Sequence, residues 1–563
     1  MEWLSPLIQR DLAKAIVQVV LELIKIEVGD DKIYAILADE CTDATGTELM
    51  TVVIRYVSST SGMISERTIG TVRVEDTSSE ELFKSVVKVL ARVNLQVSES
   101  RAQGYDGASN MSGHLAGLAA KVKAISPLAI FVHCCNHRLN LVVQQIGFEV
   151  PEYQSVLGIM RLVYNQISPS NKRLQWFRNY QSEFERVGEQ QLSIKGLSDT
   201  RWVYHYRCAH ALKECFGSVV YTLNMVINDK KSKAEQKSTC LGILLQLKDW
   251  KFAFWLTALM EILAGINHLN TVLQREKDTL WEALREVDTC RIIIKQMRTP
   301  EGFTKVWNDA KTLADKNKIT TPNLSHSSDV RTGKRKRVTK KYKDFISTGP
   351  DGASISKTRD CTVKVLYTRQ FFEVVDNLIA DFDRRFNKEY MSIVDASKCL
   401  HPYDSFESFD KKDLHDLYNH FAVDFPGHND EKLLLTEHIH YQKRLKSEVS
   451  KVVLERMTFA DITVWVHKQN TYPLLSKLLK LVIVIPSTTA TCERNFSGLS
   501  FIKNKLRNKL GDDYLDDLML GFLEKDLVNK ILKTEELRER VIDVFRDLGC
   551  GTADNKISRK RYL

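Results

Sequence analysis

The order of predicted strands and helices over residues 33–134 constrains the fold of this 563-residue chain more than any other feature. Residues 33–38 form a short apolar run, and residues 49–57 and 64–74 are rich in Val, Ile, Thr and Tyr, which favour strands. Turn-forming residues separate these segments, as in an antiparallel meander. Residues 81–93 then place apolar side chains on one face at helical spacing. The pattern predicts three strands followed by a crossover helix.

Residues 101–105, 115–125 and 128–134 continue the pattern as strand, helix and strand. Three strands, helix, strand, helix and strand is the order of an RNase H-like core, in which the first and fourth strands are parallel neighbours. Ligands of such open α/β sheets lie beyond the carboxyl ends of the strands, which is where Asp39 and Asp106 fall. The sequence therefore predicts that these two acids converge.

The chain is longer than one hydrophobic core usually organises, so a second domain or a large insertion is expected. Amphipathic helical patterns replace the strands in the middle of the chain, where a polar and basic stretch at 316–358 reads as a solvated loop. The predicted fold class is α/β plus an all-α insertion. The predicted divisions are a helical segment at 1–30, the first part of the RNase H-like core at 31–145, a helical insertion at 146–470, and the remaining core with a C-terminal helical segment at 471–563.

Composition points to a reducing compartment and gives weak evidence for a polyanionic partner. No stretch approaches eighteen uninterrupted apolar residues, so no membrane association is expected. Eleven cysteines without C-x-x-C spacing argue against a disulfide framework. The net charge of +10 mildly favours nucleic acid. Cytosol and nucleus both remain open on these grounds.

Four short motifs occur in a fixed order, and each would be weak evidence by itself. They are LADECTD at 37–43, QGYDGASNMSG at 103–113, HCCNHRLNL at 133–141 and CERNFS at 492–497. Together they resemble the hAT superfamily of DNA transposases, in particular the animal branch that includes transposase-derived zinc-finger MYM-type proteins. The resemblance covers nearly the whole chain. It implies an RNase H-like catalytic core split by a helical domain and closed by a C-terminal dimerisation segment.

In that family an acidic triad binds divalent metal, and the matching residues here are Asp39, Asp106 and Glu493. Phosphodiester cleavage needs an activated nucleophile and a clamp for the leaving oxygen, which two ions about 4 Å apart supply. Hard carboxylate oxygens suit Mg²⁺, or Mn²⁺ in its place. The resemblance therefore implies catalytic and metal-binding roles for all three acids. Taken singly, an Asp after a strand is more often a turn or helix-cap residue.

Cys134 and His137 form a C-x-x-H pair, which could be half of a zinc site. No second pair with ligand spacing stands nearby, so no zinc is predicted. The family carries the same pair near its active site, which implies a supporting role. The alternative is that both residues are packed and orient the apolar helix that follows them.

Several basic and aromatic residues are candidates for DNA contacts. Arg201 and Trp202 resemble the family's tryptophan motif, in which an aromatic side chain can stack on a displaced base, although Trp202 could equally be a core residue. The residues that could hold phosphates after the Glu493 helix are Lys503, Lys505 and Arg507. The basic run at 334–341 is typical of a nuclear-localisation or phosphate-binding patch, or of a solvated loop. Nucleus and DNA are the predicted location and partner.

An apolar stripe near the C-terminus is suited to a partner helix. Its members recur at helical spacing and are Leu515, Leu518, Met519, Phe522 and Leu523. The pattern alone is compatible with core or interface. We expect the stripe to pack partly on the RNase H-like core and partly against another subunit, so that the chain forms at least a dimer.

These expectations define two functional hypotheses. The first is a transposase that cuts DNA with Mg²⁺ or Mn²⁺ and joins the freed 3′-hydroxyl to target DNA. The second is a domesticated, non-catalytic nuclear protein that acts through DNA or protein binding and dimerisation. The intact acids at positions 39, 106 and 493 favour the first hypothesis without excluding the second.

Overall fold

The structure is a computed structural model, and it describes residues 5–43, 45–197, 205–322, 363–386, 391–504, 507 and 509–550. The chain divides into two compact units. The first comprises residues 1–140, 268–289 and 386–563, and the second comprises residues 141–267 and 290–385. The second unit is therefore inserted, in sequence, between segments of the first.

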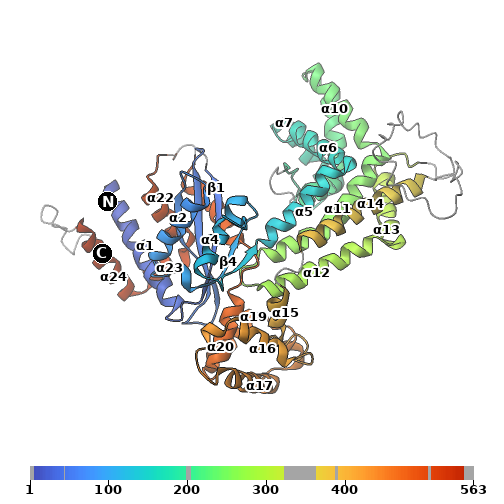
Figure 1. The fold of residues 1–563 in the computed structure, drawn as a ribbon. Coiled ribbons are helices and arrows are strands. Elements are labelled where there is room, and N and C mark those ends of the chain that lie inside the picture. The colour runs from blue at the N-terminus through green and yellow to red at the C-terminus, as the bar shows by residue number, and fades with distance from the viewer. Residues whose placement is uncertain are drawn as a thin grey trace. The chain divides into compact units, whose positions relative to one another are not determined.

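The first unit contains a five-stranded mixed sheet in the order β3-β2-β1-β4-β5 (Figure 1). Its strands are β1 (Tyr34–Thr42), β2 (Glu48–Val57), β3 (Ile64–Arg73), β4 (Ser100–Tyr105) and β5 (Ile130–His133). Strands β1 to β3 pair antiparallel, whereas β4 pairs parallel with both β1 and β5. The predicted meander and the parallel pairing of the first and fourth strands are confirmed.

Helices surround this sheet and extend the unit. They are α1 (Pro6–Val28), α2 (Ser79–Ala91), α3 (Ser109–Ser112), α4 (Leu118–Ile125), α15 (Met391–Ala396), α16 (Lys411–His420), α17 (Asp430–Glu448), α18 (Lys451–Leu454), α19 (Phe459–Gln469), α20 (Pro473–Ile483), α21 (Ala490–Ile502), α22 (Asp512–Leu523), α23 (Lys525–Lys533) and α24 (Glu535–Phe545). Residues 386–470 thus belong to the sheet unit, whereas the sequence analysis assigned 146–470 to the insertion. Amphipathic patterns reveal helices but not the core on which they pack.

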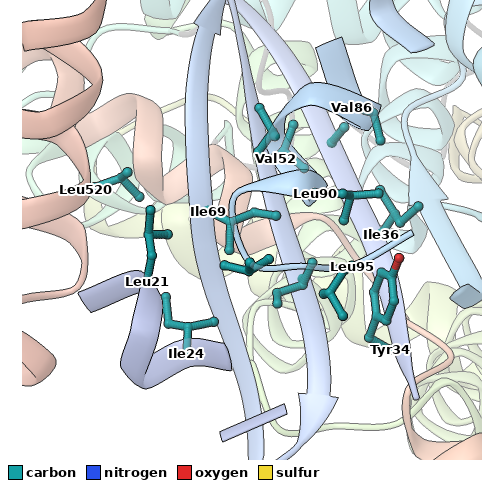
Figure 2. Packing of buried hydrophobic residues seen from close by; sticks show 14 of the residues in the cluster. Leu21, Ile24, Tyr34, Ile36, Val52, Ile69, Val86, Leu90, Leu95 and Leu520 are labelled. Atoms are coloured by element: carbon teal, nitrogen blue, oxygen red, sulfur yellow. The ribbon is translucent and has the colours of Figure 1, made fainter. Parts of the chain in front are cut away.

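The main hydrophobic core lies on one face of the sheet. Alternate residues such as Ile36 on β1, Val52 on β2 and Ile69 on β3 point to this face, because successive strand side chains alternate (Figure 2). They form one cluster with Leu21 of α1 and Leu90 of α2. Burying each such side chain stabilises the fold by roughly 1.5–3 kcal/mol. This face is filled, so a ligand site belongs on the opposite face or at the strand ends.

Helix α22 covers the edge of the sheet at β3. The amide of Thr71 donates to Asp516 Oδ1 at 2.6 Å, and the amide of Thr68 donates to Glu524 Oε1 at 2.7 Å. Exposed edge amides can pair with other chains, and here two of them are satisfied by carboxylates. The C-terminal helices therefore protect the edge strand.

The regular structure of the second unit consists of helices in the part of the chain that the structure describes. Helix α5 (Cys135–Glu149) leads into it, and the others are α6 (Pro151–Ile167), α7 (Asn171–Tyr180), α8 (His205–Glu214), α9 (Phe216–Asn228), α10 (Ala234–Leu247), α11 (Trp250–Leu273), α12 (Leu280–Met297), α13 (Pro300–Lys316) and α14 (Val363–Arg385). Aromatic rings fill its core, with Trp250 and Trp307 at 4.9 Å and Phe254 and Tyr367 at 4.7 Å between centroids. The predicted loop at 316–358 lies almost wholly outside the described residues.

Helix α11 is the one described helix that is long and apolar enough to cross a membrane, by length and composition alone. Of its apolar window, 67% is buried inside the structure. A core helix of a folded domain meets the same criteria, so this is weak evidence for a membrane span.

Candidate functional site

Asp39 lies on β1 where the parallel pairing with β4 ends. Leu37 pairs with Gly104 of β4, and Asp39 pairs with Thr51 on the antiparallel side. Asp39 shares the sheet face of Leu37, since alternate residues of a strand point the same way, and Leu37 packs against Cys492 of α21. The strand continues to Thr42 rather than ending at residue 38 as predicted, because β2 pairs with it over its whole length.

Asp106 follows the last residue of β4. Its Oδ1 accepts a hydrogen bond from the amide of Ala108 at 3.1 Å, so the carboxylate also shapes the turn. Gly107 allows this turn to pass close to β5, because a Cβ there would lie 2.6 Å from Cε1 of His133. Asp106 and the end of β5 are thereby held at the same edge of the sheet.

Glu493 lies in the first turn of α21, which begins after Thr489. The chain before this helix approaches the sheet closely at Pro486. A Cβ on Gly104 would lie 2.9 Å from Pro486 Cγ and 2.9 Å from a side-chain carbon of Leu37, so glycine is needed there. Gly104 therefore leaves room for the segment at Pro486 that leads to Glu493.

Asn495 fixes α21 on the sheet. Its Nδ2 donates to Thr51 Oγ1 at 3.2 Å and to Thr68 Oγ1 at 2.9 Å, and the side chain is buried. Thr51 is the cross-strand partner of Asp39. The same hydrogen bonds thus hold the helix of Glu493 in register with the strand of Asp39.

The Asp39 carboxylate interacts electrostatically with both other predicted acids. Burial raises the pKa of Asp39 well above its ordinary value, and repulsion from Asp106 and from Glu493 raises it further. The amide of Glu40 donates to Asp39 Oδ1 at 3.0 Å and opposes these effects. Three acids that are far apart in sequence therefore concentrate negative charge in one place.

The donor set is suited to a hard divalent cation. Carboxylate oxygens are the ligands that Mg²⁺ prefers, and a bound cation would relieve the repulsion acting on Asp39. Two further oxygens of this region, Glu40 Oε1 and Asn136 Oδ1, are buried without a hydrogen-bond partner. Within the described part of the chain, no three His, Cys, Asp or Glu side chains already stand as a ready metal-binding group. Sharing an ion would therefore require the acidic side chains to turn toward it.

Cys134 contacts the segment that leads into α21. Its sulfur accepts a hydrogen bond from the amide of Thr489 at 3.3 Å, and burial, with a contribution from Glu493, raises its pKa to about 12. A thiol with that pKa is protonated at neutral pH, whereas zinc binds the thiolate. The His137 ring lies 5.4 Å from that of His133. The contact of Cys134 is therefore that of a residue that positions the start of α21, whereas His137 packs beside the end of β5.

Asn136 is a contact that the sequence analysis did not single out. Its Nδ2 lies 3.4 Å from Glu493 Oε1. Asn136 stands in the third motif, between Cys134 and His137, but nothing in its type or spacing distinguishes it from a helix-start residue. Only the fold brings it to the acid.

Lys503 forms a structural ion pair. Its Nζ lies 2.5 Å from Asp43 Oδ2, and the lysine side chain is only 6% exposed. Although burial opposes ionisation, hydrogen bonds from Lys503, Thr45 and backbone amides hold the pKa of Asp43 below its ordinary range. The prediction that Lys503 contacts a phosphate is therefore corrected. Its ammonium group pairs with Asp43 and links the end of α21 to the β1–β2 turn.

The other predicted DNA-contacting residues are less constrained by the structure. Arg507 is exposed. Lys505, Arg201, Trp202 and the basic run at 334–341 lie outside the described residues. Their proposed contacts with nucleic acid remain predictions.

The C-terminal stripe is divided between core and surface. Leu515 and Met519 are buried against Leu499 of α21. Phe522 is 47% exposed, and its ring lies 6.2 Å from that of Phe501, which is 72% exposed. Phe522 of the stripe and Phe501 of α21 therefore form an exposed aromatic pair beside the buried residues of the stripe.

Two segments of the chain match known families. Residues 1–117 match the family described as "ZMYM1/FAM200, RNase-like domain". Residues 442–527 match the "hAT family C-terminal dimerisation region". The first segment carries Asp39 and Asp106, and the second carries Glu493, so the matches cover both parts of the candidate site.

Two curated relatives share similarity with most of the chain. Both are named "52 kDa repressor of the inhibitor of the protein kinase". The protein from Homo sapiens is 21% identical to this chain over 514 residues, and the one from Mus musculus is 21% identical over 521 residues. The alignments cover 89% of this chain and 63% of each relative, so the chain spans less than two thirds of their length. Together with the two family matches, this similarity supports a relationship of the chain to hAT-related, transposase-derived proteins.

Proposed function

We propose that this chain is a hAT-type transposase, or a close descendant, that cleaves DNA strands and transfers them to target DNA. It would use a metal-dependent acidic triad on an RNase H-like core that is interrupted by the helical unit. The observation that carries the proposal is that α21, the helix of Glu493, is anchored through Asn495 on β2 and β3 and through Cys492 against Leu37 of β1, the strand of Asp39. Asp39 lies on β1 and Asp106 follows β4, its parallel neighbour. Glu493 enters from a helix 387 residues further along the chain than Asp106 (493 − 106).

The three acids would hold Mg²⁺ or Mn²⁺, which when bound supplies an activated nucleophile and stabilises the leaving oxygen. Asp39 and Asp106 would serve as the ligands fixed by the sheet. Glu493 would complete the site from α21, oriented by Asn136 and anchored through Asn495. No zinc is part of the proposal.

DNA would be held mainly through its phosphates, which position a duplex without reading its sequence. Arg507 and Lys505 follow the helix of Glu493, and Arg201 and Trp202 are the candidates for a displaced base. The basic run at 334–341 would direct the chain to the nucleus. The hAT dimerisation region supports self-association, for which the exposed pair Phe501 and Phe522 offers an apolar contact.

The experiment is a cleavage assay on supercoiled plasmid and end-labelled duplex DNA, with Mg²⁺ or Mn²⁺. The unmodified chain is expected to nick or join DNA, and Asp106→Asn to abolish this while binding DNA as well or slightly better. Asp76→Asn is the matched control, since Asp76 caps a turn by accepting from the amide of Ser78 and is not one of the three proposed metal ligands. Equal activity of the unmodified chain and Asp106→Asn would indicate a contaminating nuclease and contradict the proposal.

A second function is favoured by the names of the relatives, which describe a repressor rather than a transposase. In this alternative the chain is a domesticated, non-catalytic nuclear protein that acts through DNA or protein binding and dimerisation. A chain that binds DNA but never cleaves it, even when fused to a heterologous DNA-recognition domain, would support this alternative.

A further inference from the structure

Arg55 on β2 is a buried charge that ties three segments together. Its side chain is 1% exposed. Its guanidinium donates to the carbonyls of Glu276 at 2.7 Å and Asp278 at 3.0 Å, in the loop between α11 and α12, and to that of Ile483 at 3.1 Å. Glu66 on β3 balances the charge at 2.7 Å. A buried arginine is tolerated when its donors are paired in this way, so the loop is firmly held to the sheet.

The same network reaches the first turn of α21. The second carboxylate oxygen of Glu66 accepts a hydrogen bond from the Thr491 hydroxyl. Arg494 donates to Thr491 Oγ1 at 2.6 Å and to the carbonyl of Gln274 at 3.0 Å, and it pairs with Glu276 at 2.8 Å. The chain of contacts therefore runs from the α11–α12 loop through the sheet to α21 and back to the same loop.

Glu493 lies two residues after Thr491 and directly before Arg494, and both of these residues form hydrogen bonds within this network. Metal ligands must be held to within about 0.5 Å of the productive geometry. We propose that the network is a positioning relay, by which the α11–α12 loop sets the placement of Glu493 relative to Asp39; its members are Arg55, Glu66, Thr491 and Arg494. The inference rests on the metal site proposed above.

The test is the affinity of the purified full chain for Mn²⁺, followed by electron paramagnetic resonance. Thr491→Val keeps the shape of a buried side chain but removes the hydroxyl that joins Glu66 to Arg494, and Thr491→Ser restores that hydroxyl. Arg494→Ala is an independent variant, whose wild-type side chain is 43% exposed and does not support the core. Thr463→Val is the matched control, since the buried Thr463 hydroxyl bonds only carbonyls of its own helix.

We expect Thr491→Val and Arg494→Ala to weaken Mn²⁺ binding about tenfold, which is the lower end of the loss when a direct partner of a metal ligand is removed, because both act on Glu493 through the helix that carries it. Thr491→Ser and Thr463→Val should bind Mn²⁺ as the unmodified chain does. Unchanged affinity in Thr491→Val and Arg494→Ala, with binding lost in Asp106→Asn, would overturn the relay and leave the metal site standing. A lower melting temperature with unchanged Mn²⁺ affinity would also overturn it. A chain without saturable Mn²⁺ binding would refute both the relay and the site.

Discussion

Replacing Glu524 by Gln probes how the C-terminal helices hold the edge strand. Glu524 is 4% exposed, and its carboxylate accepts from the amide of Thr68 at 2.7 Å and pairs with Arg67 at 2.9 Å. Burial raises the pKa of Glu524 from 4.5 to about 7. Arg67 only partly offsets the cost of burial, because it shares its charge with Glu27 and Asp526.

The sign of the pH dependence follows from this raised pKa. Between pH 4.5 and about 7 the folded state keeps a proton that the unfolded state releases. Stability therefore falls as the pH rises through this window, by up to about 3 kcal/mol for a pKa that folding raises from 4.5 to about 7. Gln does not titrate, so Glu524→Gln lacks this component. The free energy of unfolding of the unmodified chain, minus that of the variant, should fall by this amount and then level off.

Urea unfolding followed by circular dichroism at several pH values measures this difference. The subtraction cancels the titration of groups that both proteins share. A difference that stays constant across the window, or that grows with pH, would refute the reasoning. It would mean that the ion pair with Arg67 fully compensates the burial of the Glu524 carboxylate.

Three other predictions concern self-association and packing. Phe501→Asp should lower the mass of the assembly measured by light scattering, because it places a charge on the exposed aromatic surface. Phe184→Asp, at a similarly exposed aromatic of the second unit, should leave that mass unchanged. Equal masses for the unmodified chain and both variants would exclude the Phe501 surface from self-association. Gly104→Ala should lower the melting temperature, because its Cβ would lie 2.9 Å from both Leu37 and Pro486, and an unaltered melting temperature would show that the contact relaxes freely. Leu520→Ala should reduce the free energy of unfolding by about 2–5 kcal/mol in denaturant titrations, since Leu520 is fully buried; a loss well below that range would mean the cavity collapses.

The sheet was predictable because its strands carry strong local signals. A short apolar run marked β1, and segments rich in Val, Ile, Thr and Tyr marked β2 and β3. The helix between β3 and β4 required a parallel crossover that places Asp39 near Asp106. The place of Glu493 beside them came from the motif resemblance, since nothing in the local pattern of α21 indicates which sheet edge it meets. The length of β1 beyond Asp39 depends on its pairing with β2, which is a tertiary property.

Contacts between distant residues account for what the sequence did not predict. Lys503 read as a phosphate-binding residue because its neighbours are basic, but the fold buries it against Asp43. Arg55 sits in a strand pattern that gives no reason to expect four hydrogen bonds to segments elsewhere in the chain. Residues 386–470 carry the same helical periodicity as the second unit, although they pack with the sheet.

The most direct test of the central claim is a crystal structure of the full chain with Mn²⁺, using the anomalous signal of the metal. We expect an anomalous peak next to the carboxylates of Asp39 and Asp106, with Glu493 turned toward the same site. The peak should vanish in Asp106→Asn crystals grown under the same conditions. An ordered, unmodified site with no anomalous peak at saturating Mn²⁺, or a peak bound by other residues, would contradict the proposal that these three acids form a shared metal site.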